Sequence, residues 1–423
     1  MRAALAAVDA GRLVRQALAA RDVDRKLRAA AAVDVVAAGK GAAGMLSACA
    51  AAAPVPLRHV IGIGGAPARG LPAGARWHTG AHPVPDERSV SAARDVLQIA
   101  AAAGERDLLV LLLSGGASSL MALAADGLTL ADKQQASQQL LQQGAEIHDL
   151  NAVRKHLSAI KGGRLAAATV GSTLTLALSD VVGDDLSAIG SGPAVADGTT
   201  FGAALAALDR YGGRDRYPAS VVARLVQGAA GAIAETPKPG DARLARSEAR
   251  VIGGWRTAVE GARAAADALG YAVHVVEEPV IGEARVAAHE LVDLASKMAR
   301  GRAGLSLFCT LAGGETTVRA TGSGKGGRNQ ECALAMAREL DALGSAVVAA
   351  SVGTDGVDGP TDAAGAMVDS TTLARAEAAD IGPPERYLEE HNSYVFFDEL
   401  GDLIRTGPTG TNVGDVHVIL VGA

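Results

Sequence analysis

The sequence predicts an α/β fold built as two domains. Strand-like runs alternate with Ala- and Leu-rich segments of helical length almost to the end of the chain, which is typical of α/β proteins. Two of these runs, Leu108–Leu113 and Thr173–Leu178, are nearly continuous apolar stretches, as expected when helices cover both faces of a parallel sheet. A chain of 423 residues is also too long for one compact core.

The expected strands are spread over both halves of the chain. They occupy residues 34–39, 58–65, 107–116, 173–180, 249–254, 271–278, 305–314, 345–356 and 416–422. The clearest break in the periodicity is a polar stretch around Pro237, Pro239 and Gly240, since proline and glycine interrupt helices and strands. We therefore predict an N-terminal domain over residues 1–237 and a C-terminal domain over residues 238–423.

Composition narrows the classes of function. Hydrophobic residues make up 49% and charged residues 20% of the chain, which is typical of a folded globular protein. A net charge of −6 argues against nucleic acid or an anionic membrane as the main partner. Aromatic residues, at 3%, are too few for platforms that stack single-stranded bases. An anionic substrate must therefore be held by a local group of cations.

The cysteines and the N-terminus bear on the compartment. Cys49, Cys309 and Cys332 are scattered and have no C-x-x-C spacing, so a disulfide framework and a zinc site are both disfavoured. Charged residues interrupt the first apolar run from Asp9 onward, which predicts an amphipathic helix rather than a signal peptide. No run approaches the roughly 18 apolar residues of a membrane span. We expect a cytoplasmic protein.

The segment VDVVAAGKGAAGM contains a Gly-x-Gly-x-x-Gly turn, formed by Gly39, Gly41 and Gly44. This order is found in dinucleotide-binding turns. Such a site also needs an acidic residue at the end of the second strand to hold the ribose hydroxyls, but the run at residues 58–65 ends in glycine. Lys40 adds a cation where a dinucleotide turn needs only backbone. The pattern therefore favours a ligand richer in phosphate than NAD, with a plain tight turn as the alternative.

The sequence SGGASS at residues 114–119 is a better candidate for a phosphate cradle. Its two glycines allow backbone N–H groups to turn toward an anion, its serine hydroxyls can donate, and a helix is expected to follow. The alternative is a serine-capped helix that begins after a buried strand.

An acidic loop follows the expected strand at residues 173–180. It carries Asp180, Asp184 and Asp185. Carboxylates at a strand end suit either Mg²⁺ binding or proton transfer from a substrate hydroxyl. The alternative is a solvated acidic turn.

A Gly-rich loop in the second half carries two cations, Lys325 and Arg328, between an expected strand and an expected helix. Its glycines are Gly322, Gly324, Gly326 and Gly327. Ordering so many glycines costs backbone entropy, and close approach of the backbone to a ligand would offset that cost. The loop therefore predicts a second phosphate-binding element.

Two further polar loops each lead out of or into an expected strand. The first contains Asp355, Asp358 and Asp362. It lacks the residue offsets of an EF-hand but suits one metal ligand or a ribose contact. The second, Thr406–Asp415, is Gly-rich and precedes the last strand.

Together these segments resemble the class II glycerate kinases, the glycerate 2-kinases with a C-terminal MOFRL-type domain. The resemblance spans nearly the whole chain, in the order of the family. It rests on AAGKGAAGM, GAHPVPDERSV, LLLSGGASSL, NAVRKHLSAIKGGRLA, LSDVVGDDLSAIGSGP, GGETTVRATGSGKGGRNQE, VGTDGVDGPTDAAGA and GPTGTNVGDV. The chain departs from the family pattern at Trp255, where a small polar residue, usually Asn, is expected.

The resemblance implies ATP-dependent phosphorylation of D-glycerate at its 2-hydroxyl, with Mg²⁺, to give 2-phosphoglycerate and ADP. It also implies a Rossmann-like, parallel-sheet N-terminal domain and a smaller, mixed-sheet α/β C-terminal domain, with the active site in the interdomain cleft. The partners would be D-glycerate and the nucleotide, with no nucleic acid and no membrane. Assembly as a homodimer is left open.

The resemblance also assigns catalytic roles. Lys40 and Arg328 match the lysine and arginine proposed as catalytic in the family, and phosphoryl transfer needs such cations because it depends on positioning and charge neutralisation. We expect Asp180 to orient or deprotonate the glycerate hydroxyl, with Asp184 as the alternative base. The expected metal ligands are Asp184 and Asp355.

A larger set of residues is expected to contact phosphate or substrate. These are Gly39, Gly41, Ser114, Gly115, Gly116, Ser118, Ser119, Arg154, Lys155, Gly326, Gly327 and Asn329. The alternative for Arg154 and Lys155 is that they are ordinary surface charges on a helix. His156 is expected to be structural.

Two other functions stay open at this point. One is an NAD(P)H-dependent reductase of hydroxypyruvate or tartronate semialdehyde, which the missing ribose acid and the lack of a His–Asp proton relay disfavour. The other is a nucleotide-binding regulator without catalysis, which would turn over no ATP when glycerate is added.

Overall fold

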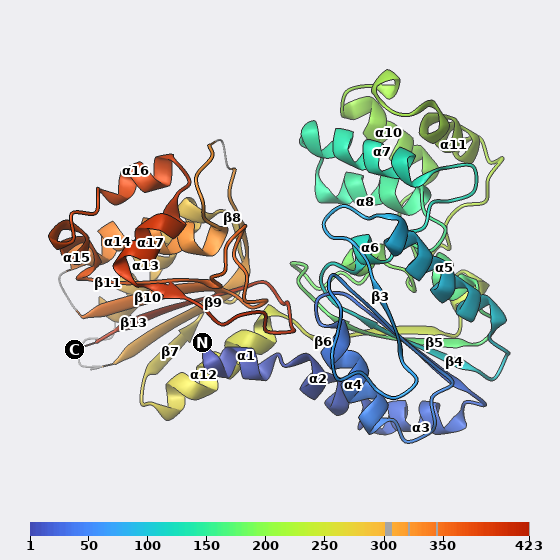
Figure 1. The fold of residues 1–423 in the computed structure, drawn as a ribbon, viewed down its shortest axis with the longest axis horizontal. Coiled ribbons are helices and arrows are strands. Elements are labelled where there is room, and N and C mark those ends of the chain that lie inside the picture. The colour runs from blue at the N-terminus through green and yellow to red at the C-terminus, as the bar shows by residue number, and fades with distance from the viewer. Residues whose placement is uncertain (301–306, 320–321, 344–345, 423) are drawn as a thin grey trace. The chain divides into compact units, whose positions relative to one another are not determined.

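The computed structural model describes residues 1–300, 307–319, 322–343 and 346–422, which form two compact units. We call Ala10–Leu178 with Gly183–Ile252 the N-terminal unit. Gly253–Ala423, together with Met1–Asp9 and Ser179–Val182, is the C-terminal unit. Each unit has its own sheet and its own helices (Figure 1). None of the described helices combines the length and the apolar character needed to cross a membrane.

The N-terminal unit is built on a six-stranded sheet of order β3-β2-β1-β4-β5-β6. The strands are β1 (Val33–Ala38), β2 (His59–Gly64), β3 (Arg76–Thr79), β4 (Leu108–Leu113), β5 (Ser172–Leu178) and β6 (Ser247–Gly253). β1 pairs in parallel with β2 and with β4, and the pairs β2–β3 and β4–β5 are also parallel. This confirms the parallel sheet predicted for the first half, and the strand order is that of a doubly wound fold.

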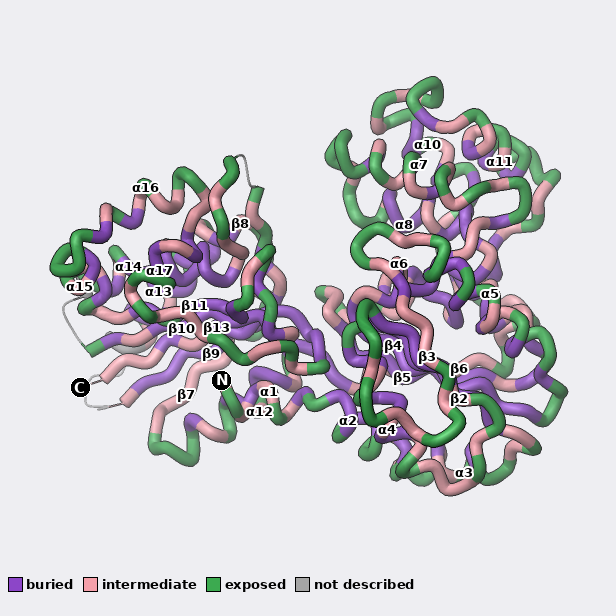
Figure 2. The backbone as a smooth tube through the Cα atoms, viewed as in Figure 1, coloured by how far each residue is buried: buried purple, intermediate pink, exposed green. Residues whose placement is uncertain are grey.

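The central strands of this sheet are buried along their whole length. Every residue of β1 and of β4 is buried, and Figure 2 shows the same for the tube through β4. Helix α4 (Ala42–Ala52) packs on β1 and β2, and α2 (Ala10–Leu18) packs on α4. A strand covered in this way needs no polar alternation, which explains why these runs are continuously apolar.

A group of four helices stands beside the sheet within the N-terminal unit (Figure 1). They are α7 (Leu130–Gln142), α8 (Ile147–His156), α10 (Phe201–Arg210) and α11 (Ala219–Ala229). Their apolar faces share a core around the fully buried Phe201. Gly228 allows the close approach of α11, since a Cβ there would lie 2.2 Å from Phe201 Cγ. This helical group holds α8, which carries Arg154 and Lys155.

The C-terminal unit contains a seven-stranded mixed sheet. Its path is β12-β11-β10-β13-β9-β7, and β8 also pairs with β9. The strands are β7 (Ala272–Val275), β8 (Val280–Glu283), β9 (Phe308–Thr317), β10 (Val347–Gly353), β11 (Gly365–Asp369), β12 (Leu403–Ile404) and β13 (Asp415–Val421). β7 and β8 run parallel to β9, and the other pairs are antiparallel. The predicted mixed sheet is thus confirmed.

Helices cover this second sheet as well. α13 (Ala284–Arg300) and α14 (Arg328–Leu343) pack together and against the strands. α12 (Trp255–Ala268) packs on β7 and β9, and α1 (Arg2–Ala7) packs on α12. Trp255 is 5% exposed, and a Cβ on Gly313 would lie 2.9 Å from its Cε3. Trp255 therefore fills the core of this unit beside β9.

The compact units are not divided at residue 237. β6 lies beyond that residue in sequence, yet it lies next to β5 in the N-terminal unit. Met1–Asp9 belongs to the C-terminal unit, where Gly261 lets α1 approach α12, because a Cβ there would lie 2.3 Å from Ala7 Cβ. The predicted domain boundary after residue 237 stays a prediction.

Candidate active site

The strand order of the N-terminal sheet reverses between β1 and β4. In doubly wound folds, ligands bind at the carboxyl ends of the strands that flank such a point. The turn Gly39–Gly41 follows β1, and the turn Ser114–Gly116 follows β4. β1 and β4 pair in register up to Ala38 and Leu113, so the two turns begin at the same level. Two Gly-rich motifs that lie far apart in the sequence are thus neighbours.

The two turns are hydrogen-bonded to each other. Lys40 N donates to Gly115 O at 2.9 Å, and Gly41 N donates to Ser114 Oγ at 3.0 Å. Gly39 has a φ of +126°, and a Cβ there would lie 2.2 Å from Ser114 Oγ. The glycine is therefore required by the contact between the turns. Ser114 is fully buried, whereas the Lys40 side chain is exposed, so the interlocked turns hold a solvent-facing lysine on a fixed backbone.

The remainder of the SGGASS sequence forms a short helix, α6 (Ala117–Leu120), after Gly116. Gly116 has a φ of +86°, a conformation that favours glycine. Ser119 Oγ donates to Pro83 O at 2.7 Å, and Ser118 Oγ lies 2.8 Å from Ser191 Oγ. Both serines keep some exposure. Their hydroxyls are thus anchored next to the β4 turn.

The two cations at the end of α8 have different surroundings. Lys155 is buried, and its Nζ lies 3.2 Å from Asp197 Oδ1 in an ion pair. Arg154 is half-buried, and burial lowers its pKa from the ordinary value. Consecutive residues on a helix point about 100° apart, by the 3.6-residue turn, so the pair does not act as one cationic patch. Among the described residues, Arg154 has no carboxylate within ion-pairing distance.

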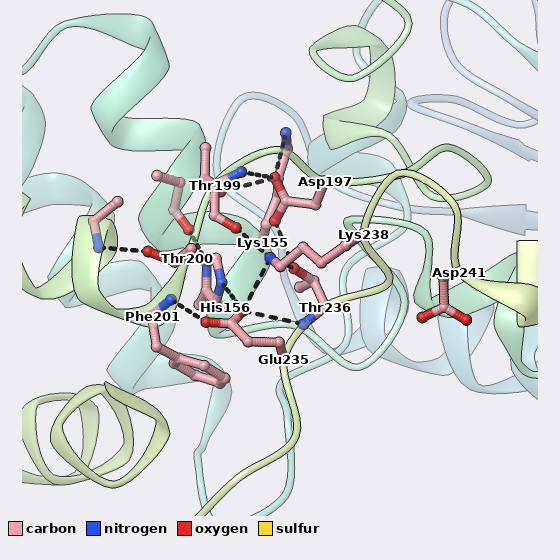
Figure 3. Close-up of polar contacts among 12 residues, drawn as sticks. Lys155, His156, Asp197, Thr199, Thr200, Phe201, Glu235, Thr236, Lys238 and Asp241 are labelled. Carbon is pink, nitrogen blue, oxygen red and sulfur yellow. Dashed lines mark hydrogen bonds and ion pairs between the residues drawn. The ribbon is translucent and has the colours of Figure 1, made fainter. Parts of the chain in front are cut away.

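His156 belongs to the same buried polar network (Figure 3). Its Nδ1 lies 2.7 Å from Ala152 O, and its Nε2 lies 3.1 Å from Glu235 Oε2. Glu235 also accepts from Phe201 N at 2.7 Å and pairs with Lys238 Nζ at 3.0 Å. These contacts tie α8 to α10 and to the segment before β6. His156 is thus a structural residue, as expected.

Asp180 lies in the C-terminal unit, although the strand that precedes it, β5, belongs to the N-terminal sheet. Asn412 Nδ2 donates to Asp180 Oδ2 at 2.8 Å. Ser179 N donates to Gly253 O at 2.9 Å, which fixes the backbone next to the carboxylate. Asp180 is half-buried. The loop Thr406–Asp415 therefore holds the carboxylate that the sequence singles out as a base.

The other acidic residues of the predicted site differ in their hydrogen bonding. Asp185 accepts from Ser187 N and Ser187 Oγ, at 2.8 and 2.9 Å. Asp184 has a φ of +54°, and its Oδ1 is buried without a hydrogen-bond partner among the described residues. Asp355 Oδ1 accepts from Val357 N at 3.1 Å. Within the described ranges no three acidic, histidine or cysteine side chains form a metal-binding group.

Arg328, at the start of α14, is held by two carboxylates. Its Nε and Nη2 donate to Asp415 Oδ2 and Oδ1 at 2.8 and 3.0 Å, and its Nη1 lies 3.0 Å from Glu315 Oε1. Burial alone would lower the pKa of Arg328, but Asp415 and Glu315 raise it above its ordinary value. About a third of the side chain is exposed (32%), whereas that of Asp415 is fully buried. The guanidinium is thus a permanent charge in a fixed orientation.

The residues around Arg328 support it from inside the unit. Asn329 Nδ2 donates to Asp415 Oδ1 at 2.9 Å, and Asn329 N and Gln330 N donate to the two oxygens of Asp358 at 3.1 and 2.8 Å. Asp358 therefore caps α14 from another loop. Burial raises the pKa of Asp358 to about 6, although the two N–H donors oppose the shift.

Two glycines of the loop before α14 lie against Asp358 and Ser393. A Cβ on Gly327 would lie 2.3 Å from Asp358 Cγ, and one on Gly326 would lie 2.4 Å from Ser393 Oγ. Contacts within the protein thus already require these glycines. The adjacent Ala320 and Thr321 of the same loop lie outside the described residues.

Three residues that bind predicted site residues are themselves absent from the set predicted from the sequence. Asp415 and Asn412 lie in the loop Thr406–Asp415 before the last strand. The glycines and polar residues of this loop mark it as a candidate binding loop, but they do not indicate which of its residues takes part. Lys161 is buried and donates from Nζ to Ser118 O at 2.7 Å. It follows Arg154 and Lys155 in one basic segment, and nothing in that segment marks it as the lysine that reaches the β4 turn.

Comparison with known proteins shows which family the chain belongs to. Residues 1–226 match the family DUF4147, a domain of unknown function, and residues 308–415 match the MOFRL family. Glycerate 2-kinase of Pyrococcus horikoshii is 40% identical over 342 residues, which cover 80% of this chain and 76% of that protein. A protein of Agrobacterium vitis, provisionally named a hydroxypyruvate reductase, is 42% identical and covers 92% of this chain and 87% of its own length. The crystal structure of glycerate kinase from Thermotoga maritima superposes with a TM-score of 0.85 at 34% identity, covering 99% of this chain and 97% of that one.

Proposed function

The chain belongs to the glycerate 2-kinase family with a MOFRL domain, and from this premise we propose that it phosphorylates D-glycerate at its 2-hydroxyl with ATP. The hydroxyl oxygen forms a bond to the γ-phosphorus while the bond from phosphorus to the bridging oxygen of ADP breaks. The hydroxyl proton passes to a carboxylate. The products are 2-phosphoglycerate and ADP.

The observation that carries this proposal is the interlocked pair of turns after β1 and β4. They present the exposed Lys40 at the switch point of a doubly wound sheet, where such folds bind phosphates. A compact ammonium there can neutralise charge on the transferred phosphoryl group. Arg328, in the C-terminal unit, is a second, permanently charged group of the kind that phosphoryl transfer uses. In phosphoryl transfer such cations account for most of the rate.

The end of β2 disfavours the reductase. A dinucleotide site holds the ribose with an acidic residue at this position, but here β2 ends in Gly64 and Gly65 follows. The Trp77 ring covers the strand, since Cβ atoms on Gly62 and Gly64 would lie 2.2 and 2.5 Å from it. Trp77 Nε1 also donates to Ala66 O at 2.9 Å. This end of the sheet thus lacks the ribose acid and is covered by an indole.

Asp180 is our choice for the group that orients and deprotonates the glycerate hydroxyl. Asn412 donates to one of its oxygens, which fixes the carboxylate. Asp184 is the alternative base. A bound Mg²⁺ would neutralise phosphate charge, and the unpartnered buried oxygen of Asp184 is the kind of ligand that Mg²⁺ takes. Asp355 is the second proposed ligand.

The predicted phosphate and substrate contacts divide into two groups. The first group lies in the turn after β4 or in α6, or, in the case of Arg154, has no carboxylate within ion-pairing distance among the described residues. We propose that this group contacts substrate; its members are Gly115, Gly116, Ser118, Ser119 and Arg154. Gly39, Gly41, Ser114, Lys155, Gly326, Gly327 and Asn329 bond or pack within the protein, and we propose that they position the others. The Mg²⁺ requirement, cytoplasmic location and homodimeric assembly stay predictions.

The test is to identify the product by ³¹P NMR after incubation with ATP, Mg²⁺ and D-glycerate. We expect 2-phosphoglycerate, which enolase alone converts to phosphoenolpyruvate. A product that needs phosphoglycerate mutase before enolase would show phosphorylation at the 3-position and contradict the proposal. NADH oxidation with hydroxypyruvate should be undetectable, and nucleotide binding without ATP turnover when glycerate is added would support a regulator instead.

A further inference from the structure

Lys161 connects two segments that flank the β4 turn. It lies between α8 and α9 (Arg164–Ala167) and is 3% exposed. Its Nζ donates to Ser118 O at 2.7 Å and also to Ser118 Oγ, and it lies 3.5 Å from Ser191 Oγ. Ser191 ends the short 3₁₀ helix Ile189–Ser191. One ammonium group thus joins the SGGASS sequence to the loop that follows the acidic turn.

The charge of Lys161 is not balanced by the protein. Within the described part of the chain, no carboxylate lies at ion-pairing distance from it, and its acceptors are neutral oxygens. The neighbouring acids are already engaged, since Asp197 pairs with Lys155 and Glu235 pairs with Lys238. A buried cation without a counter-charge is costly. A bound anion would remove that cost.

The groups that face Lys161 increase the imbalance. Burial lowers the pKa of Lys161 well below its usual value, and the positive charges of Lys133 on α7 and Arg154 on α8 lower it further. Lys133 itself donates to a neutral acceptor, Leu157 O, at 3.1 Å. From the segments on its other side, Lys161 meets the hydroxyls of Ser118 and Ser191. The surroundings thus combine three basic groups, while the two neighbouring acids, Asp197 and Glu235, are paired with other lysines.

The serine pair provides a route from this charge to a ligand. The bond between Ser118 Oγ and Ser191 Oγ, at 2.8 Å, uses one of two hydroxyl hydrogens. Ser191 is 1% exposed, whereas Ser118 is half-buried. If Ser191 donates to Ser118, the Ser118 hydrogen stays available on the exposed side. A hydroxyl that accepts from an ammonium is also a stronger donor, because hydrogen bonds in a chain polarise one another.

We propose that Lys161 is a positioning residue for substrate binding. It orients and polarises Ser118, and an oxyanion of the bound substrate balances the positive charge of Lys161. This role rests on the proposed kinase function. The oxyanion is either the carboxylate of D-glycerate or a phosphate of ATP. Because binding an anion favours the charged lysine, the substrate that contacts Ser118 should bind with proton uptake.

The test compares Lys161→Met with Lys133→Met, which also removes a buried ammonium, but one that within the described part of the chain donates to Leu157 O and to neither serine. Charge-assisted hydrogen bonds are the strong ones, and we expect Lys161→Met to raise KM for one substrate by about 10- to 100-fold. A rise confined to glycerate identifies the carboxylate, and a rise confined to ATP identifies the phosphate. Lys133→Met should leave both KM values within about twofold of wild type.

A double-mutant cycle with Ser118→Ala tests whether Lys161 acts through the serine. If it does, Lys161→Met/Ser118→Ala should raise the same KM no more than the worse single variant, because coupled residues are not additive. In wild type, that KM should rise with pH as Lys161 loses its proton, and the rise should be absent in Lys161→Met. Fully additive effects, or equal losses for both substrates, would overturn the proposal.

Two further measurements keep the outcome clear. If Lys161→Met does not fold, Ser118→Ala keeps the lysine and must raise the same KM by itself; unchanged KM values would reject the role. If wild type has no glycerate kinase activity, the proposed function fails first. Calorimetric titration of wild type and Ser118→Ala with D-glycerate and with a non-hydrolysable ATP analogue then decides the inference separately. If Ser118→Ala binds each ligand with the same affinity as wild type does, the inference is overturned.

Discussion

Arg328 and Asp415 form a two-point ion pair in which both carboxylate oxygens accept from one guanidinium, at 2.8 and 3.0 Å. Asp415 opens β13, opposite Gly314 of β9, so the carboxylate is anchored in the sheet. Thr316 N also donates to Asp415 Oδ2 at 3.3 Å. A forked pair fixes the plane of the guanidinium as well as its position. The arginine is therefore presented in one orientation before any substrate binds.

The first prediction follows from this pair. Arg328→Ala should lower kcat by about 10³-fold or more, because an arginine that neutralises the transferring phosphoryl group is worth about 10³–10⁵ in rate. Asp415→Asn should lower kcat less, since the charge of Arg328 stays while its orientation is loosened. Steady-state kinetics measures both, and thermal unfolding shows whether each variant is folded. A folded Arg328→Ala enzyme with wild-type kcat would remove the arginine from the mechanism.

The second prediction concerns Lys40. Lys40→Ala should also lower kcat by about 10³-fold, on the same charge argument. Lys40→Arg should not restore activity, because a planar fork cannot replace a compact ammonium in a turn confined by Gly39 and Gly41. Lys325→Ala removes a lysine of the other Gly-rich loop, whose Nζ lies 3.9 Å from the centroid of the Tyr394 ring, and should lower kcat much less than Lys40→Ala does. Recovery of activity in Lys40→Arg would show that position 40 needs only a positive charge.

How far the sequence could predict the site depends on whether the signal is local. The Gly39–Gly41 and Ser114–Gly116 turns were recognisable because each follows a continuous apolar strand, and their contact follows from the strand order. The pairing of Asn412 with Asp180 joins residues 232 positions apart. No local pattern marks such a contact, because it depends on how loops from distant strands meet.

The basic segment on α8 shows a second limit. Arg154 and Lys155 are adjacent in sequence and were expected to act alike, but helix geometry separates their directions. Lys155 turns into the unit and pairs with Asp197. Lys161, a few residues later, makes the contact with Ser118. The sequence marks this segment as basic, and only packing distinguishes its lysines.

The third prediction concerns acid stability. The pKa of Asp358 is raised to about 6 in the folded protein, so the native state holds this proton more tightly than the unfolded state does. The stability that Asp358 contributes should therefore fall as pH rises from about 4 to about 6, and this contribution should be lost above about pH 6. In Asp358→Asn this contribution should vanish. Thermal unfolding from pH 4 to pH 7 measures the difference between the variant and wild type.

The control for this prediction lies in the same loop. Asp362 accepts from Tyr394 Oη at 2.7 Å, and this hydrogen bond lowers its pKa. Its contribution to stability is present above the unfolded pKa and is lost as pH falls below about 4. Asp362→Asn should therefore leave the pH dependence between 4 and 6 as in wild type. If Asp358→Asn and wild type show the same dependence there, Asp358 does not titrate in that range.

The last prediction concerns Asp180 and its partner Asn412. If Asp180 takes the proton of the glycerate hydroxyl, Asp180→Asn should lower kcat by about 10²–10⁴-fold and leave ATP affinity nearly unchanged. Asn412 donates to one carboxylate oxygen, so Asn412→Ala should lower kcat by a smaller factor, since the base remains but is less well oriented. Asn412→Asp should be the more damaging change, because it replaces that donor with a second negative charge 2.8 Å from Asp180, and like charges so close disfavour ionisation of both.

The pH profile of kcat separates these cases: Asn412→Asp should shift its acidic limb to higher pH, whereas Asn412→Ala should mainly lower its height. An unchanged kcat in Asp180→Asn would transfer the role to Asp184, and equal losses in Asp180→Asn and Asp184→Asn would mean that neither carboxylate alone is the base.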